Sequence, residues 1–148
     1  MSMQSWLEEF YPTKASQFIK DKNAIAAIEH SLHKWSGANA KNMAKHEVTF
    51  TRGALTSVGS TAFGFATESC SLCMFASDED GDLRDCSLCP IVIGGDQTCD
   101  GIDNMQGAVS EQSPYAIWLN TGDSEPMITL LQQVLDYYKE KEKNALFE

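Results

Sequence analysis

The sequence has no long apolar run and is poor in basic residues and proline. Of its 148 residues, 11 are basic, 21 are acidic and 4 are proline, and the formal net charge is −10. No stretch approaches the roughly 18 uninterrupted apolar residues of a membrane-spanning helix. The acidic excess repels a phosphate backbone. We therefore expect a protein that neither spans a membrane nor binds nucleic acid nonspecifically.

The beginning of the sequence lacks the order of a secretory signal. Apolar side chains there alternate with charged ones such as Glu8, Glu9 and Lys14. A signal would instead have a basic start, an apolar run and small residues at its end. The length of 148 residues suits one domain with one hydrophobic core. We expect a single zinc-stabilised domain over residues 1–148, located in the cytoplasm.

Hydrophobic periodicity predicts helices in the first third of the chain. Residues 21–37 carry apolar side chains at spacings of three and four, with Asp21 as the expected N-cap and Gly37 beyond the end. Shorter helical segments are expected over residues 5–11 and 38–46.

The remaining pattern predicts an α+β fold. Residues 48–67 are rich in Thr, Ser, Val, Phe and Gly, and Phe63 and Phe65 alternate with smaller residues as in a half-buried strand. A last apolar face begins near Ser124, and Pro126 suits the first turn of a helix there. We expect amino-terminal helices and a carboxy-terminal helix packed on a small antiparallel sheet, with a cysteine-bound zinc loop.

Four of the five cysteines form two identical arms. The tetrapeptide Cys-Ser-Leu-Cys places Cys70 with Cys73 and, after twelve intervening residues, Cys86 with Cys89. Such paired arms are typical of zinc sites, because the two sulfurs of each arm can bind one tetrahedral ion. Metal binding would also explain how a polar, glycine-rich loop folds. We predict one structural zinc ion at Cys70, Cys73, Cys86 and Cys89.

The fifth cysteine and other thiol chemistry leave alternatives open. Cys99 could replace Cys86 if the chain turns differently. The pattern is also compatible with an iron–sulfur cluster, redox-active C-x2-C pairs or disulfides. A cytoplasmic compartment argues against disulfides, and redox motifs need a helix that follows a strand. A four-cysteine site has no open coordination position, which favours a structural metal over a catalytic one.

Short motifs stand in a fixed order around the cysteine arms. They are Trp-Leu-Glu-Glu-Phe-Tyr-Pro at 6–12, His-Ser-Leu-His-Lys-Trp at 30–35, Cys-Pro-Ile at 89–91, and Pro114-Tyr115 followed by Trp118. In this order they resemble the small cysteine-rich proteins of tailed bacteriophages, a family with no settled activity. The acidic loop at 77–85 and the insert between Cys99 and Pro114 depart from the family pattern. The resemblance implies a protein made inside an infected bacterium, where small accessory proteins block or absorb host defences.

Three residues of the helix expected at 21–37 are candidates for binding a small ligand. A cation beside an aromatic plane could hold a phosphate and stack a base, so His30, Lys34 and Trp35 would suit a nucleotide. The alternative is structural: Trp35 anchors the core, Lys34 favours the negative end of the helix, and His30 makes a buried hydrogen bond.

These observations lead to three functional hypotheses. The first is a non-enzymatic phage accessory protein that binds a host protein and inhibits host defence. The second is a sponge that sequesters a small nucleotide signal, with a pocket that could lie between the subunits of a homo-oligomer. The third is a hydrolase that uses His30, His33 or His46 with acidic residues and a second metal.

Overall fold

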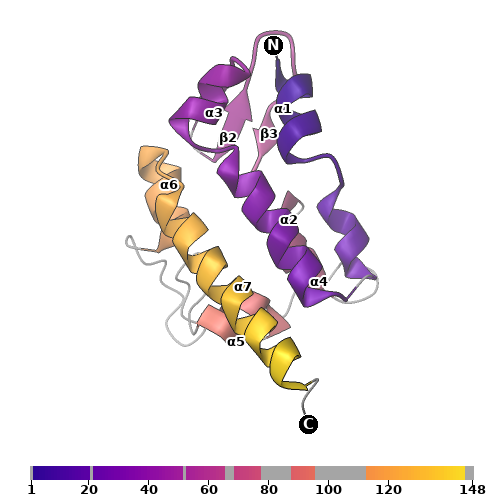
Figure 1. Cartoon of the computed structure of the whole chain (residues 1–148). Coiled ribbons are helices and arrows are strands. Elements are labelled where there is room, and N and C mark those ends of the chain that lie inside the picture. The colour runs from indigo at the N-terminus through magenta and orange to yellow at the C-terminus, as the bar shows by residue number, and fades with distance from the viewer. Residues whose placement is uncertain are drawn as a thin grey trace.

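Helices precede a small sheet in the first half of the chain, and a long helix lies near its end (Figure 1). The computed structural model describes residues 2–20, 22–51, 53–65, 69–77, 88–95 and 113–145. The helices are α1 (Met3–Phe10), the 3-10 helix η1 (Ala15–Ile19), α2 (Ala24–Ser36), α3 (Ala40–Lys45), α4 (Ser71–Phe75), α5 (Pro90–Gly95), α6 (Pro114–Thr121) and α7 (Glu125–Ala145). The strands are β1 (Thr49–Thr51), β2 (Ala54–Thr56) and β3 (Phe63–Gly64). This mixture confirms the predicted α+β class.

α1 packs over the end of α2, where Gly37 allows a close approach. A Cβ atom at this position would collide with the ring of Phe10, so only glycine fits without a shift. The indole Nε1 of Trp6 donates a hydrogen bond to the carbonyl oxygen of Gly37 at 2.9 Å. Trp6 and Phe10 are both buried. Their burial and this bond fix α1 against α2.

α2 begins later than the sequence analysis expected. Its N-cap is Asn23, whose side chain accepts a hydrogen bond from the backbone N–H of Ala26 at 3.1 Å. Asp21, the expected cap, lies outside the described residues. Asparagine and aspartate cap helices about equally well, so the apolar spacing alone did not locate the first turn. The helix ends at Ser36, and Gly37 follows it as predicted.

The sheet lies within the segment 48–67, for which β-structure was predicted. Its strand order is β1-β2-β3, and both pairs are antiparallel. Leu55 of β2 is buried and pairs with Phe50 on one side and Phe63 on the other. Gly53 has a φ of 80° in the turn between β1 and β2, a conformation that glycine adopts without strain. Because the strands are only two or three residues long, their stability depends on packing against helices.

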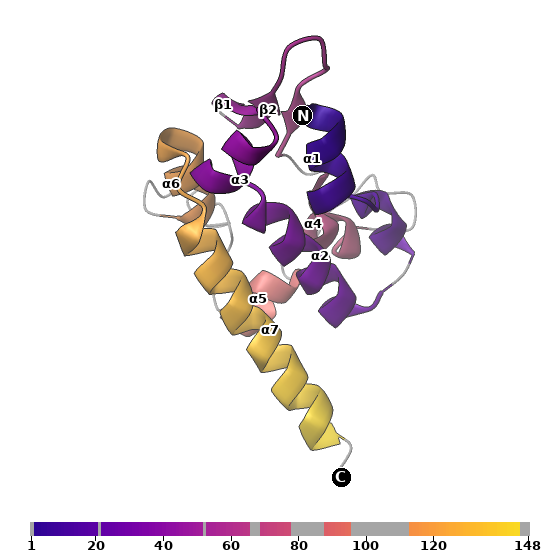
Figure 2. The ribbon, with the colours of Figure 1, turned by 45° about the horizontal axis from the view of Figure 1, so that its top comes forward.

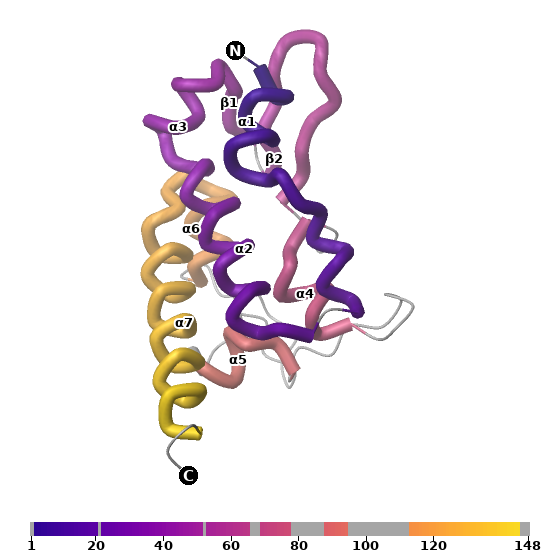
Figure 3. Tube along the Cα trace, turned by 45° about the vertical axis from the view of Figure 1, so that its right-hand side comes forward, coloured from indigo at the N-terminus to yellow at the C-terminus, as the bar shows by residue number. Residues whose placement is uncertain are grey.

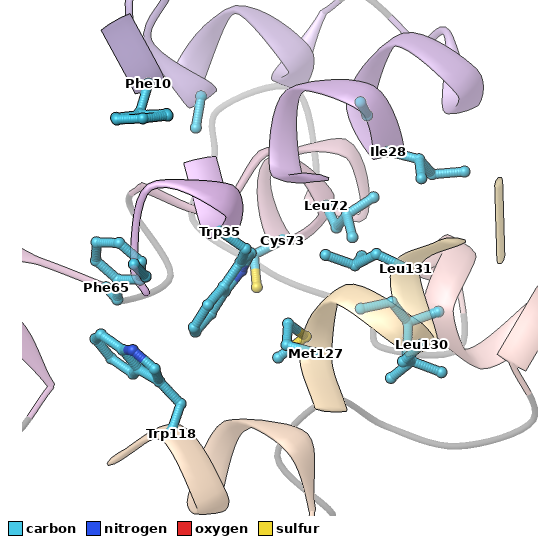
Figure 4. Packing of buried hydrophobic residues seen from close by; sticks show 14 of the residues in the cluster. Phe10, Ile28, Trp35, Phe65, Leu72, Cys73, Trp118, Met127, Leu130 and Leu131 are labelled. Atoms are coloured by element: carbon cyan, nitrogen blue, oxygen red, sulfur yellow. The ribbon is translucent and has the colours of Figure 1, made fainter. Parts of the chain in front are cut away.

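Aromatic side chains join the sheet to α2 and α6. Phe65, directly after β3, stacks on Trp118 of α6 with ring centroids 4.6 Å apart and planes 21° apart. Trp35 of α2 meets both rings edge-on, with its centroid 4.9 Å from each. Figure 4 shows these three rings among the other core side chains. Pairs of this kind contribute about 0.5–1.5 kcal/mol each beyond their buried area, so the cluster holds three elements together.

α7 closes the core, as the apolar face near Ser124 predicted. It packs against α2 and α5 (Figures 1 and 2). Its buried side chains form one stripe at helical spacing, made of Met127, Leu130, Leu131, Val134 and Leu135. None of the helices in the described ranges is both long enough and apolar enough to cross a membrane.

Two parts of the described chain extend from this core. The end of α7 runs on past α5, and residues 139–145 are exposed (Figure 2). The connection between β2 and β3 forms a projecting loop (Figure 3), and Val58 within it is fully exposed. Cys70 and Cys89 lie elsewhere, directly before α4 and α5.

Candidate metal centre

Two of the predicted zinc ligands, Cys70 and Cys73, lie together at the start of α4. Cys70 is the N-cap residue in an extended conformation, and Cys73 belongs to the following turn. The backbone N–H of Cys73 donates to Sγ of Cys70 over 3.4 Å, and the Cys73 thiol also hydrogen-bonds to this sulfur. Cys70 is half-buried and Cys73 is buried. One arm therefore has both sulfur atoms in contact, as the C-x2-C spacing predicted.

The surroundings of Cys70 favour its thiolate form. A hydrogen bond from the Cys73 thiol and the charge of the nearby Lys34 ammonium lower the pKa of Cys70 to about 5, although burial opposes this shift. The backbone N–H groups of Cys73 and Leu72 act in the same direction. Thiolate is the form that binds metal ions, and it is also the form that attacks electrophiles. At neutral pH the arm is prepared for metal binding.

Hydrogen bonds hold α4 firmly against the amino-terminal half of the chain. The buried hydroxyl of Ser71 donates to the carbonyl oxygen of Ala27 in α2 at 2.6 Å. At the other end of α4, Lys22 Nζ donates to the carbonyl oxygens of Phe75 and Ser77 at 2.5 and 3.0 Å. The Lys22 ammonium also lies 5.5 Å from the centre of the Phe75 ring. A fixed arm loses little conformational freedom when it binds a metal ion.

Lys34 lies beside this arm, inside the core. Its relative exposure is 1%, although lysine is among the residues least often buried. Its Nζ donates to the carbonyl oxygen of Ser69 at 3.0 Å, and Ser69 directly precedes Cys70. The ammonium stands 4.9 Å from the ring centre of Phe65 and 5.4 Å from that of Trp35. A positive charge is thus placed next to the predicted first arm.

The second arm is described only at Cys89, directly before α5. Cys89 is buried, and its carbonyl oxygen accepts a hydrogen bond from the backbone N–H of Val92 at 3.0 Å. Pro90 begins α5, a position that suits proline because its missing N–H has no helical partner. Burial and the neighbouring Tyr137 and Cys89 raise the pKa of Tyr138, which places this cysteine near α7.

The complete zinc ligand set remains a prediction. Cys86 and Cys99 lie outside the described residues, so the choice between them stays open. Within the described ranges, no group of three or more His, Cys, Asp or Glu side chains is arranged to hold a metal ion. The chemistry of the first arm nevertheless fits zinc, which prefers thiolate ligands supported by N–H donors. A bound zinc ion would supply a cross-link between the two arms.

The order of the elements revises one argument about thiol chemistry. A redox-active pair was disfavoured from the sequence because such motifs need a helix that follows a strand, which the cysteine loop did not show. In the structure, α4 follows β3, and Cys70 caps its first turn. A redox role for Cys70 and Cys73 therefore remains the alternative to metal binding.

The three residues predicted to bind a ligand lie at packing positions. Lys34 and Trp35 are buried in the core, and His30 packs between the rings of Tyr11 and Phe18. His30 Nε2 is 2.6 Å from the carbonyl oxygen of Thr13. Burial lowers the pKa of His30, so the ring stays neutral near pH 7 and attracts phosphate less. Nucleotide binding at these residues stays a prediction, and the geometry favours their structural alternative.

A hydrogen-bonded chain that the sequence analysis did not foresee links α1 to the end of α3. His46 is buried; its Nδ1 lies 2.8 Å from Oγ of Ser5, and its Nε2 lies 3.0 Å from Oε1 of Glu9. The arrangement has the residue types of a serine–histidine–carboxylate triad. However, the Ser5 hydroxyl also belongs to the capping box of α1 through Ser2. We interpret the chain as a structural link, since its hydroxyl is engaged in the helix cap.

Comparisons with models of known protein families, with curated proteins and with solved structures find no match to this chain. The fold and the cysteine arm therefore have to be interpreted from their own geometry.

Proposed function

We propose that this chain is a zinc-stabilised binding protein without enzymatic activity, and that its partner is a host protein of the bacterium in which it is made. The observation that carries the zinc part is the Cys70–Cys73 pair. Its two sulfurs are in contact, N–H groups point at one of them, and a lysine ammonium lies nearby. N–H donors of this kind support metal-bound thiolates, and the ammonium favours the thiolate form that binds metal.

The positions of Cys70, Cys73 and Cys89 support a structural role for the metal. Cys70 and Cys73 are held against α2 through Ser71, whereas Cys89 directly precedes α5, which packs on α7. One ion bound by both arms would fix α5 and α7 relative to α2 across a polar connecting loop. Structural zinc sites contribute roughly 10 kcal/mol or more to folding, which is enough to order such a loop. The rigid surface that results is the proposed binding surface.

The polar side chains support a binding role better than a catalytic one. Lys34 is enclosed by aromatic rings, and Ser5, Glu9 and His46 link two helices. A site with four thiolates also leaves no coordination position for an activated water. The host-protein partner rests on the resemblance to small proteins of tailed bacteriophages, and inhibition of host defence is the role proposed for the complex.

The test combines zinc content with partner binding. The wild type and the variants Cys70→Ser, Cys86→Ser and Cys99→Ser are purified without a tag, and zinc is counted per chain. We expect one zinc in the wild type and in Cys99→Ser, and none in the other two variants. Zinc retained in Cys86→Ser but lost in Cys99→Ser would instead assign Cys99 to the ligand set.

Each zinc-containing and zinc-free form is then used to capture proteins from a bacterial lysate. A captured protein is purified separately, and its binding is measured by calorimetry. We expect binding by the wild type and by Cys99→Ser, and loss of binding in Cys70→Ser. Equal binding by the zinc-free variant would contradict a role for the metal in forming the surface. Failure to find a directly binding protein, with zinc present, would contradict only the partner proposal.

A further inference from the structure

The last turns of α7 carry an exposed face outside the core. Its residues stand at helical spacings of three and four and therefore lie on one side of the helix; they are Tyr137, Glu140, Lys141 and Asn144. All four are exposed, and Tyr137 keeps 41% of its surface accessible. Together with Ala145 they line a shallow hollow of about 540 Å³. Figure 2 shows this end of the helix extending past α5.

Exposed apolar side chains adjoin this face on the side of α5. Within the described residues, three of the four large apolar side chains that are exposed belong to α5, to α7 or to the residue before Cys89: Leu88 at 55%, Ile93 at 43% and Tyr137 at 41%. α5 lies against Tyr137, because a Cβ atom at Gly94 would stand 3.0 Å from Cδ1 of the tyrosine ring. Apolar side chains gathered on a charged surface are typical of an interaction site.

The charges of this face are complementary to a second copy of the same face. In an antiparallel pair of helices with a two-fold axis between positions 140 and 141, Glu140 of each copy faces Lys141 of the other. The same axis places Tyr137 opposite Asn144, and an amide can hydrogen-bond to a tyrosine hydroxyl. A parallel pair would instead place glutamate against glutamate and lysine against lysine. The charges therefore favour the antiparallel arrangement.

The strength of such an association is limited by the rest of the chain. The formal net charge of −10 makes two copies repel each other at long range. Two turns of helix with the edge of α5 form a small surface beside the roughly 800 Å² that each partner buries in a standard interface. Exposed ion pairs also contribute little each. We expect a weak dimer with a Kd on the order of 10–100 µM.

We propose that the end of α7 is a self-association surface, on which a second copy of this chain packs antiparallel with Glu140 and Lys141 paired across a two-fold axis. The proposal goes beyond the binding function proposed above, because it requires neither zinc nor a host protein. A second copy is the occupant that the face itself specifies, since both charges and both polar ends of the face are matched by their own symmetry mates.

The experiment measures the dimer dissociation constant of the full-length protein by sedimentation equilibrium, from about 1 µM to 1 mM, a range that brackets a weak dimer. The variants are Glu140→Lys, Lys141→Glu and the double exchange of both charges. The matched control is Lys139→Glu, which changes the net charge as Lys141→Glu does but lies on another side of the helix. Circular dichroism shows whether each variant is folded.

We expect Glu140→Lys and Lys141→Glu, each alone, to dimerise about 10-fold or more weakly than the wild type, because two attractive pairs become two repulsive ones. The double exchange restores both pairs and should return the Kd to within about threefold of the wild type. An equimolar mixture of the two single variants should also associate about as strongly as the wild type, since each face then meets opposite charges. Lys139→Glu should stay within about threefold of the wild type.

Three results would overturn the inference. A wild type that stays monomeric at about 1 mM would show that the face does not bind its own copy; loss of host-protein capture in Lys141→Glu would then assign the face to that partner. A dimer that the double exchange fails to restore would place the interface elsewhere. Equal weakening by Lys139→Glu and Lys141→Glu would show that net charge, rather than pairing, controls association.

Discussion

Within the described residues, a buried lysine in the core and a cluster of charged side chains at the surface are built in opposite ways. In the core, Lys34 is enclosed by aromatic rings beside the cysteine arm. At the surface, Glu9 pairs with Lys45 at 2.8 Å and with His46 at 3.0 Å, and the Glu9 and Lys45 side chains are 33% and 53% exposed. Water and salt screen the surface cluster but barely reach the core one. The comparison implies large effects on folding and metal binding in the core and small effects at the surface.

Removal of the metal should have the largest effect. We expect a chelator to destabilise the wild type by roughly 10 kcal/mol or more, because the binding energy of a structural zinc ion becomes folding energy. Urea unfolding followed by circular dichroism, with and without chelator, measures the change. An unfolding midpoint that is the same with and without chelator would show that the metal does not stabilise the core.

The buried hydroxyl of Ser71 gives the second prediction. Ser71→Ala leaves the carbonyl oxygen of Ala27 without this donor in the core, so we expect a loss of about 1–3 kcal/mol in the free energy of unfolding. Ser16→Ala is the matched control, because Ser16 is exposed on η1, and it should change stability by less than about 0.5 kcal/mol. Similar losses in both variants would show that α4 is not anchored through this bond.

The smallest effect is expected at the surface cluster, and it should depend on pH. Hydrogen bonds from Lys45 and His46 lower the pKa of Glu9 below its ordinary value of 4.5. A carboxylate with a lowered pKa stabilises the fold above the ordinary value, and this contribution is lost as the pH falls through the lowered value. Glu9→Gln should therefore melt slightly below the wild type at pH 7, where the Glu9 carboxylate is ionised, and the difference should shrink when salt screens the charge.

Differential scanning calorimetry of the zinc-loaded proteins at pH 7, at low and at high salt, tests this prediction for the surface cluster. A difference between Glu9→Gln and the wild type that persists unchanged at high salt would mean that packing, rather than charge, accounts for it.

Local patterns in the sequence predicted α1, α2, α3, α7 and the region of the sheet, but they did not predict η1, α4, α5 or α6. The C-x2-C spacing is consistent with the contact between Cys70 and Cys73. Periodicity located α2 and α7, and a spacing of three residues is enough to bring two side chains together on one turn. The cap of α2 was missed because Asn23 and Asp21 suit the same role. Short-range rules thus worked where the interacting groups are close in sequence.

Contacts between distant residues could not be predicted in the same way. Ser5 and His46 are separated by 41 positions, and no local spacing relates them. Lys34 was expected near the end of its helix, where a lysine is usually solvated, but Ser69 and the aromatic cluster enclose it. Only the packing of α2 against the region before α4 reveals this environment.

The central claim is that zinc and the cysteine arms organise the core region. Native mass spectrometry of the untagged protein, combined with elemental analysis before and after treatment with a chelator, tests it most directly. We predict one zinc ion per chain and a shift to highly charged, unfolded ions once the metal is removed. A metal-free protein that keeps its compact charge states would contradict the claim and would favour redox chemistry at Cys70 and Cys73.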